Sequence, residues 1–238
     1  MVTVQKLTIL HAPNHAPDVA GATIRLATRT GADSIGMSEA YRVTRLLAHV
    51  DGYRVTYGKG ARDRRRGAKD VPILTKTTHA SLGAGAVQIS EAAKPVRLAP
   101  DRWLTFSLFA SELGPVAHLN LHPNAGVAHA PATSARRREY AESMATLERY
   151  VRLFRLEGFL VVVTGDLNYP ANLHEDVPAW APSEVFRRLD LGVWSKHLDY
   201  IAFDQRLKLF GSGVMGRHET GSDHPWLLAT FTRRQTKA

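Results

Sequence analysis

A chain of 238 residues can form one large α/β domain or two small ones, and its 44% hydrophobic content can supply a sizeable core. Lysine and arginine outnumber aspartate and glutamate by 31 to 22, so the formal charge of +9 favours a polyanionic partner without assigning a function. The sequence has no cysteine, which excludes disulfides, thiolate metal sites and a cysteine nucleophile. Any metal must therefore be held by oxygen and imidazole ligands.

The N-terminal residues lead directly into a strand-like segment, without a charged leader or a small-residue cleavage site. No apolar run approaches the ~20 residues that cross a bilayer. We therefore expect a cytoplasmic, monomeric protein without a membrane span. Because no repeat and no low-complexity linker divides the chain, we also expect a single domain over residues 1–238, with a disordered tail at its end.

Before residue 122 the sequence predicts one helix and several strands, and the middle stretch from residue 71 to residue 121 is predicted to be mostly sheet. Residues 7–10 predict a strand, residues 19–30 a helix that ends at Gly31, and residues 34–38 a second strand. Four more strands are predicted, at residues 71–76, 87–90, 103–109 and 116–121. Because turn residues separate these four, we expect them to pair antiparallel in succession.

The clearest predicted helix covers residues 135–157, with Ser134 as its N-cap and Gly158 as its stop. Its apolar residues recur at steps of four and three and form one stripe: Tyr140, Met144, Leu147, Val151 and Phe154. Residues 159–163 follow and are apolar at every position, which predicts a central strand covered on both faces. The polar segment Thr164–Asn168 ends this strand, so we expect chemistry there.

That segment carries a resemblance. Gly165-Asp166-Leu167-Asn168 resembles the Gly-Asp-Phe-Asn signature of the endonuclease/exonuclease/phosphatase superfamily, which has the deoxyribonuclease-I-like fold. Residues 32–39, 198–201 and 221–224 resemble three further motifs of that superfamily, in its chain order. Residues 116–123 resemble the strand that presents its first catalytic histidine. The resemblance implies an α/β protein with a four-layer α-β-β-α sandwich, in which helices flank two packed, mainly antiparallel sheets.

The resemblance also implies a hydrolytic metal site. Glu39 and Asp223 would be the ligands of Mg²⁺ or Mn²⁺, since hard cations prefer oxygen ligands. Asp166 would orient and deprotonate the attacking water, and Asn168 would donate its amide to a phosphate oxygen as negative charge develops there.

Two histidines would complete the implied machinery. Asp199 would hydrogen-bond one ring nitrogen of His224 and favour its charged form, so that the other nitrogen faces the phosphate. His122 would lie on the opposite side of the same phosphate. The acidic partner that usually orients this first histidine cannot be identified in the sequence.

Structural, non-catalytic interpretations of three of these residues also stay open. Glu39 follows a strand and precedes a helix-like segment, so it could be a carboxylate favoured by a helix dipole. Asp199 could be a charge on an edge strand, and His122 before proline could be a loop or core residue.

The sequence departs from the superfamily at its first strand, which normally ends in asparagine near the metal. Here the strand ends in His11, and Asn14 follows three residues later. Either could contribute to substrate binding. An imidazole at this place could contact phosphate or favour a softer cation such as Mn²⁺.

Basic residues suggest the substrate. A glycine-containing loop between residues 58 and 70 carries six of them, and we expect its arginines to contact phosphates: Arg62, Arg64, Arg65 and Arg66. Arg136–Arg138 would oppose the dipole of the predicted helix, so helix stability does not explain them. A charge run can also be only a solvated face.

The sequence therefore predicts a metal-dependent phosphodiester hydrolase, a nuclease that cleaves DNA, and it leaves open whether RNA is also a substrate. The first alternative is a phosphatase or phosphodiesterase of the same superfamily that acts on inositol phosphates or phospholipid head groups. The second is a non-catalytic nucleic-acid-binding module. Such a module should have lost one of Asp166, Asp223 or His224, and this sequence has all three.

Overall fold

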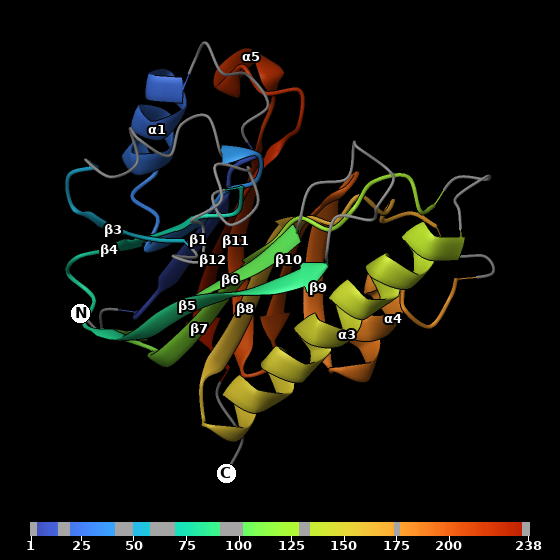
Figure 1. The fold of residues 1–238 in the computed structure, drawn as a ribbon. Coiled ribbons are helices and arrows are strands. Elements are labelled where there is room, and N and C mark those ends of the chain that lie inside the picture. Colours follow the sequence, from blue (N-terminus) through green and yellow to red (C-terminus); the bar gives the residue numbers. More distant parts are fainter. Residues whose placement is uncertain are drawn as a thin grey trace.

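The computed structural model describes residues 4–13, 20–40, 50–57, 70–90, 102–128, 134–173 and 177–234. Within these ranges, two six-stranded sheets pack face to face, with helices on their outer faces (Figure 1). The strand order is β11-β12-β1-β2-β4-β3 in sheet A and β5-β6-β7-β8-β10-β9 in sheet B. The predicted four-layer α-β-β-α sandwich is confirmed.

Sheet A draws its strands from both ends of the chain. They are β1 (Leu7–His11), β2 (Ser34–Gly36), β3 (Tyr53–Thr56), β4 (Ile73–Lys76), β11 (Leu207–Met215) and β12 (Trp226–Arg233). Helix α1 (Ala20–Arg29) packs on its outer face through Ile24 and Ala27, and the short α5 (Arg217–Thr220) precedes β12. The first and last strands of the chain are therefore neighbours.

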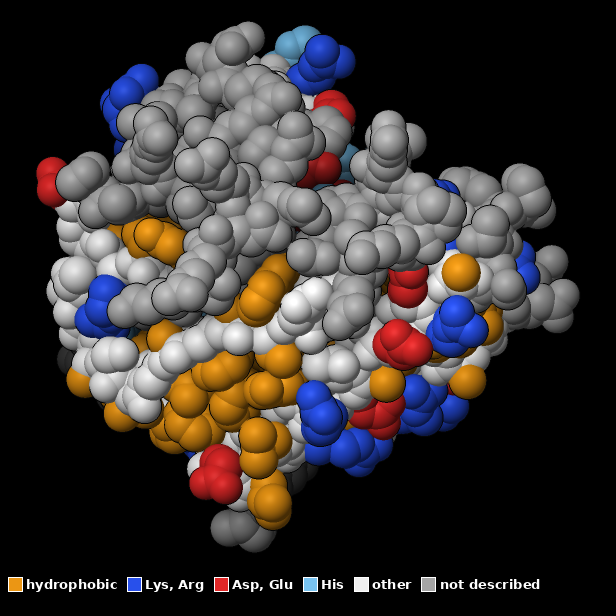
Figure 2. All heavy atoms as spheres, viewed as in Figure 1, with side chains coloured by type: hydrophobic (Ala, Val, Ile, Leu, Met, Phe, Trp, Pro, Cys, Tyr) orange, Lys and Arg blue, Asp and Glu red, His pale blue; other side chains and the backbone are white. Residues whose placement is uncertain are grey.

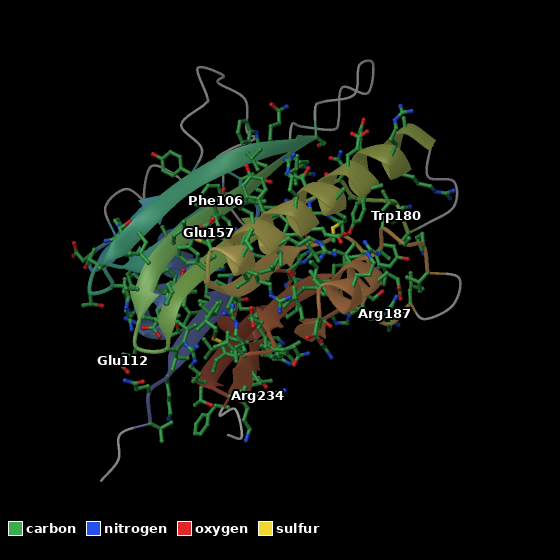
Figure 3. All side chains as sticks on the ribbon, turned by 90° about the horizontal axis from the view of Figure 1, so that it is seen from below. Phe106, Glu112, Glu157, Trp180, Arg187 and Arg234 are labelled. Carbon is green, nitrogen blue, oxygen red and sulfur yellow. The ribbon has the colours of Figure 1, made fainter. Side chains whose placement is uncertain are left out.

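Sheet B comes from the middle of the chain. Its strands are β5 (Ser81–Ser90), β6 (Arg102–Ser111), β7 (Gly114–Leu121), β8 (Leu160–Asp166), β9 (Leu191–Lys196) and β10 (Asp199–Asp204). Helices α3 (Ser134–Leu156) and α4 (Pro182–Arg188) lie along its outer face (Figure 3). Phe106 packs under α3 against Tyr150 and Phe154, while Trp180 packs against Tyr140. Among the described residues, no helix has the length and apolarity to cross a membrane.

The apolar run before Asp166 has a simple explanation. Leu160 and Val162 belong to the core between the two sheets, whereas Val161 and Val163 belong to the core under α3. Because successive residues of a strand point to opposite faces, a strand buried on both sides must be apolar throughout. This burial fixes the position at which β8 ends, and with it Asp166.

Two predicted features of the strands are wrong. The segments at 71–76 and 87–90 do not pair, because β4 pairs with β2 and β3 in sheet A while β5 pairs with β6 in sheet B. The chain changes sheets between them. Strand β5 also begins at Ser81 rather than Val87, since its first half is partly exposed and, apart from Leu82, consists of small residues without apolar alternation.

Each sheet contains one parallel pair near its centre. Strands β1 and β2 pair in parallel in sheet A, and β7 and β8 do so in sheet B. The other neighbouring strands within each sheet pair antiparallel. The carboxyl ends of parallel strands meet at one edge, which is where polar residues of open α/β sheets assemble.

The glycine before Asp166 is required by packing. A Cβ at Gly165 would lie 2.3 Å from the carbonyl oxygen of Leu121 on β7, and neither backbone can move freely in a paired strand. We expect Gly165→Ala to lower the free energy of unfolding by about 1 to 3 kcal/mol, measured by urea denaturation. Gly213→Ala on β11 is the control, because a Cβ there meets nothing within 4 Å. Equal stability of the two variants would contradict this explanation.

Candidate active site

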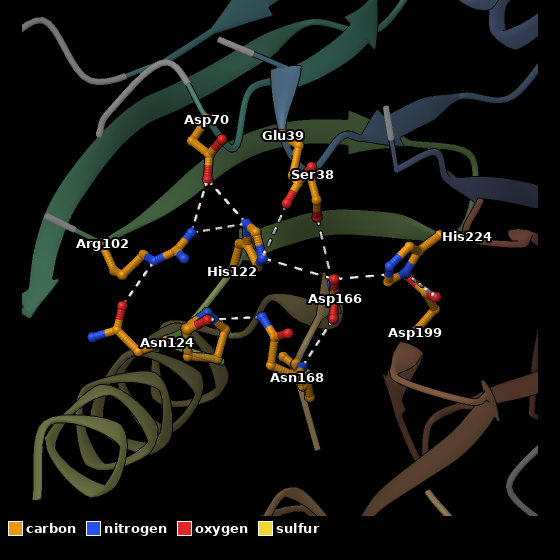
Figure 4. A network of polar contacts seen from close by, with 12 residues as sticks. Ser38, Glu39, Asp70, Arg102, His122, Asn124, Asp166, Asn168, Asp199 and His224 are labelled. Carbon is orange, nitrogen blue, oxygen red and sulfur yellow. Dashed lines mark hydrogen bonds and ion pairs between the residues drawn. The ribbon is translucent and has the colours of Figure 1, made fainter. Parts of the chain in front are cut away.

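The ends of four strands bring polar residues together at one edge of the two sheets (Figure 4). Strand β1 ends in His11, β2 leads to Glu39, β7 leads to His122 and β8 ends in Asp166. The antiparallel strand β10 begins with Asp199, which pairs with Asp166. Residues far apart in the sequence thus meet where the sheets adjoin.

Asp166 lies at the centre of this group. Its side chain is only 5% exposed, and its Oδ2 lies 3.7 Å from His122 Nε2 and 3.6 Å from His224 Nδ1. Its Oδ1 accepts a hydrogen bond of 2.9 Å from the backbone N–H of Asn168. One carboxylate oxygen is therefore held by the turn, and the other faces two imidazoles.

Two site residues have left-handed backbones. Glu39 has a φ of 57° and Asn168 a φ of 51°. Asparagine tolerates this region, but for glutamate it costs energy that the surroundings must offset. The Asn168 amide also donates to the carbonyl oxygen of Pro123 at 3.0 Å, which ties the turn after β8 to the segment after β7. These conformations aim both side chains into the group.

His122 has an acidic partner that sequence motifs did not reveal. Its Nδ1 lies 2.9 Å from Asp70 Oδ2, and its Nε2 faces Asp166 and, at 4.0 Å, Glu39 Oε1. Asp70 comes directly after the basic loop and before an apolar segment, which are weak local signals. Only the fold brings it next to His122.

Arg102 supports this pair from β6. Its Nη1 donates to Asp70 Oδ2 at 3.2 Å and lies 3.0 Å from His122 Nδ1, and its Nε donates to Asn124 Oδ1 at 3.0 Å. Asn124 in turn donates to Glu139 of α3. Burial lowers the pKa of Arg102, against the nearby charges of Asp70 and Asp166. The guanidinium thus balances the buried acidic charge, and neither Arg102 nor Asn124 stood out in the sequence.

The second imidazole, His224, is held by Asp199. The fully buried Asp199 contacts His224 Nδ1 through Oδ2 at 3.0 Å and His11 Nε2 through Oδ1 at 2.9 Å. His11 is itself fully buried, and its Nδ1 has no hydrogen-bond partner among the described residues. His11 therefore has no exposed surface for a phosphate and lies behind Asp199.

These contacts set the charges of the pair. The hydrogen bond to Asp199 raises the pKa of His224 to about 9, although burial opposes it; the charges of Asp166, Asp199 and Asp223 add to the rise. For Asp199, burial pushes the pKa up, but the hydrogen bonds from His11 and His224 outweigh it and leave the pKa below its usual value. At neutral pH, His224 is a cation beside an ionised Asp199.

The raised pKa of His224 predicts a stability change at alkaline pH. Since the folded value of about 9 exceeds the ordinary value of 6.5, the extra stability is complete below about pH 6.5 and disappears as the pH rises through 9. It amounts to at most about 3 kcal/mol. Urea denaturation at pH 6 and pH 10 should show this loss in the wild-type protein but not in His224→Gln. The same pH dependence in both proteins would contradict the assignment.

The residues present fit a hard divalent cation. One ligand atom each from Asp166, Asp199 and His224 lies within 4.8 Å of the others. However, Asp199 uses both oxygens on imidazoles, and a protonated His224 has no lone pair for a metal. Asp166 remains available, and Glu39 faces the same nitrogen of His122 as Asp166 does. Carboxylate oxygens of this kind suit Mg²⁺ or Mn²⁺.

The remaining predicted site residues divide into two groups. Asp223 is exposed beside His224, and its charge contributes to the raised pKa of that histidine. The others lie outside the described residues: Asn14, Arg62, Arg64, Arg65 and Arg66.

Comparisons with solved structures agree on the fold. The chain is similar to an endonuclease/exonuclease/phosphatase family protein from Bacteroides thetaiotaomicron, at 15% identity and a TM-score of 0.68, covering 98% of this chain and 100% of the other. It is similar to a mannosyl-6-phosphatase of the same organism, at 17% identity and a TM-score of 0.67, covering 95% and 99%. It also resembles the catalytic domain of human nocturnin with bound sulfate, at 13% identity and a TM-score of 0.67, covering 97% and 94%.

Sequence comparisons add no assignment. No model of a protein family matches the chain, and neither does any curated protein. The structural likeness covers nearly the full length of this chain and of the three proteins compared with it. The chain therefore has the fold of the endonuclease/exonuclease/phosphatase proteins.

Proposed function

We propose that this protein is a metal-dependent phosphoester hydrolase, and that it cleaves phosphodiesters of DNA and also of RNA. One observation carries the proposal. Asp166 Oδ2 lies between His122 and His224, 3.7 Å and 3.6 Å from their nearest ring nitrogens, and each imidazole has its own carboxylate, Asp70 or Asp199. A base flanked by two oriented imidazoles suits proton transfer beside a charged phosphate.

The metal would be held by Glu39 and Asp223, with the carboxylate of Asp166 close by. When bound there, a divalent cation would neutralise charge on the phosphate oxygens and on the leaving oxygen. Oxygen ligands and the absence of cysteine support Mg²⁺ or Mn²⁺ over a thiophilic metal. The strained backbone of Glu39 also supports a functional role, because such conformations persist mainly where function needs them.

In the proposed reaction each side chain has a separate role. Asp166 accepts a proton from the attacking water, and the His224 cation donates a hydrogen bond or a proton to the phosphate. Asp199 keeps His224 charged, and His11 holds Asp199 in place rather than touching the substrate. Asn168 donates an amide N–H to a phosphate oxygen, and His122 binds the phosphate from the other side.

A polyanionic substrate is supported by the charge distribution around α3. Its first turn carries Arg136–Arg138. The side chain of Arg136 lies beside Gly126 in the loop after His122, since its Nη1 would be 3.0 Å from a Cβ placed on that glycine. At the opposite end of α3, Arg152 and Arg155 are paired with Glu148 and Asp204. Hydrophobic side chains, orange in Figure 2, gather on the surface beside β5. The three arginines at the site end of the helix would neutralise backbone phosphates.

A second candidate is a phosphatase for sugar or inositol phosphates. The structural likeness to a mannosyl-6-phosphatase favours it, because that protein shares the fold over 95% of this chain. A phospholipid head group is a related substrate. A non-catalytic nucleic-acid-binding module is the third candidate, although Asp166, Asp223 and His224 are all present.

A substrate panel separates these candidates. The purified protein is incubated with supercoiled plasmid, a single-stranded DNA oligonucleotide, an RNA oligonucleotide, mannose 6-phosphate and an inositol phosphate, in Mg²⁺ or Mn²⁺. We expect nicked plasmid or shortened oligonucleotides, and no cleavage in EDTA or with His224→Gln.

Intact nucleic acid together with phosphate release from a small phosphomonoester would reverse the choice of substrate. Nucleic-acid binding without hydrolysis of any substrate would favour the binding module. Cleavage that EDTA abolishes but His224→Gln retains would point to a contaminating nuclease.

A further inference from the structure

Asn120 is a fully buried amide between the two sheets, one of the buried polar residues on β7. Its Nδ2 donates to the carbonyl oxygen of Met37 at 2.7 Å and to that of Pro72 at 3.3 Å. Met37 directly follows β2 and Pro72 directly precedes β4, and both of these strands belong to sheet A. Asn120 belongs to sheet B. One side chain therefore bridges the two sheets at their shared edge.

The three bridged segments each lead to a site residue. Glu39 comes two residues after Met37, Asp70 two residues before Pro72, and His122 two residues after Asn120. The first two segments are also bonded to each other, since Met37 N–H donates to the Pro72 carbonyl at 3.0 Å. The Asn120 amide thus completes a connection between the two carboxylates that face His122.

The orientation of this amide is fixed by neighbouring side chains. Thr164 Oγ1 donates its single hydrogen to Asn120 Oδ1 at 2.9 Å. In its second hydrogen bond, of 2.8 Å, Thr164 Oγ1 must therefore accept the N–H of His118 Nε2. His118 Nδ1 then accepts from Ser34 Oγ at 2.7 Å. Burial lowers the pKa of His118 to about 3, so the ring is neutral and fills both roles. With its oxygen engaged by Thr164, the Asn120 amide can turn only its N–H groups to the carbonyls.

The backbone beneath Asn120 allows this close approach. A Cβ at Gly36 would lie 2.1 Å from Thr164 Oγ1 and 2.8 Å from Asn120 Oδ1. The strand that leads to Glu39 therefore needs a glycine opposite this pair. Glu39 itself keeps a left-handed φ of 57°, which the surrounding contacts must enforce.

We propose that Asn120 is a positioning residue that sets Glu39 and Asp70 relative to His122, and thereby the affinity of the site for a divalent cation. The part that concerns the cation rests on the proposed function. The part that concerns the geometry does not, because the bonds to Met37 and Pro72 are made by protein atoms alone.

The test compares three variants of similar side-chain size. Asn120→Val removes the amide, and Thr164→Val removes only the hydroxyl that orients it. Thr105→Val is the control, because Thr105 pairs with Asn120 on the adjacent strand, is fully buried, and its hydroxyl has no hydrogen-bond partner among the described residues. Thermal unfolding identifies a temperature at which each variant is fully folded.

Two readouts are taken on the folded proteins. Electron paramagnetic resonance of free Mn²⁺ gives the dissociation constant, which we expect Asn120→Val to raise about 10- to 100-fold and Thr164→Val to raise less. Hydrogen exchange of the metal-free protein should become faster at residues 37–40 in both variants. Thr105→Val should match the wild type in both measurements.

The proposal would be overturned if folded Asn120→Val bound Mn²⁺ with wild-type affinity and its residues 37–40 exchanged hydrogen at the wild-type rate. Exchange that accelerates evenly across both sheets would also overturn it, since that marks a structural role alone. If Asn120→Val does not fold, the same criteria apply to Thr164→Val. A wild-type protein that binds no Mn²⁺ would count against the proposed function, while the exchange rates would still decide the geometric part.

Discussion

Asp166→Asn should lower kcat for phosphoester hydrolysis by about 10²- to 10⁴-fold, the usual contribution of a positioned general base. The amide has the same shape and can still accept the N–H of Asn168 on its oxygen, so the turn after β8 is retained. What is lost is the negative oxygen that faces His122 and His224. The measurement is kcat at saturating metal on whichever substrate the panel identifies.

The matched control for that substitution is Asp190→Asn. Asp190 is exposed after α4 and has a φ of 50°, a conformation that asparagine also accepts. The substitution Asp190→Asn should leave kcat unchanged. An Asp166→Asn protein with full activity and a wild-type unfolding midpoint would show that this carboxylate is not the base.

Glu39→Gln should reduce kcat/KM by about 10²-fold or more at low metal concentration, because an amide oxygen is a weaker ligand for a hard cation than a carboxylate. Raising Mg²⁺ or Mn²⁺ should recover part of the activity, and titration with the metal measures how much. EDTA should abolish activity in both proteins. Glutamine keeps the length of the side chain, so its contact distance to His122 can be preserved.

Glu184→Gln is the control for Glu39→Gln. Glu184 pairs with Arg187 on the surface of α4, an exposed pair whose loss should matter little. The activity of Glu184→Gln should depend on metal concentration as that of the wild-type protein does. If Glu39→Gln also has wild-type metal dependence, then Glu39 is not a ligand, and its strained backbone requires another explanation.

Much of the fold could be predicted from local patterns. The stripe of α3 and the continuous apolar run of β8 are local consequences of burial, so both elements lie where periodicity places them. Polar residues after buried strands then gave the positions of Asp166 and His122. The first half of β5 was missed because small exposed residues such as Ser81 and Ala84 leave no periodic signal.

The support of the site could not be predicted in this way. Asp70 and Arg102 are 32 positions apart, and they meet only because β4 and β6 belong to different sheets that pack together. Asn120 and His118 alternate with apolar residues on β7, and this local pattern does not show what either side chain contacts. Their roles depend on which strands adjoin across the sandwich, and that information is absent from short sequence windows.

The place of β1 between β12 and β2 has a consequence for synthesis. Residues 7–11 emerge from the ribosome long before their partner at residues 226–233. The long separation makes this pairing slow, and the exposed edge of β1 must wait for the final hairpin. Asp223 and His224 directly precede β12, so a nascent chain that stops before them lacks part of the polar group around Asp166, and this group can assemble only once β12 has been made.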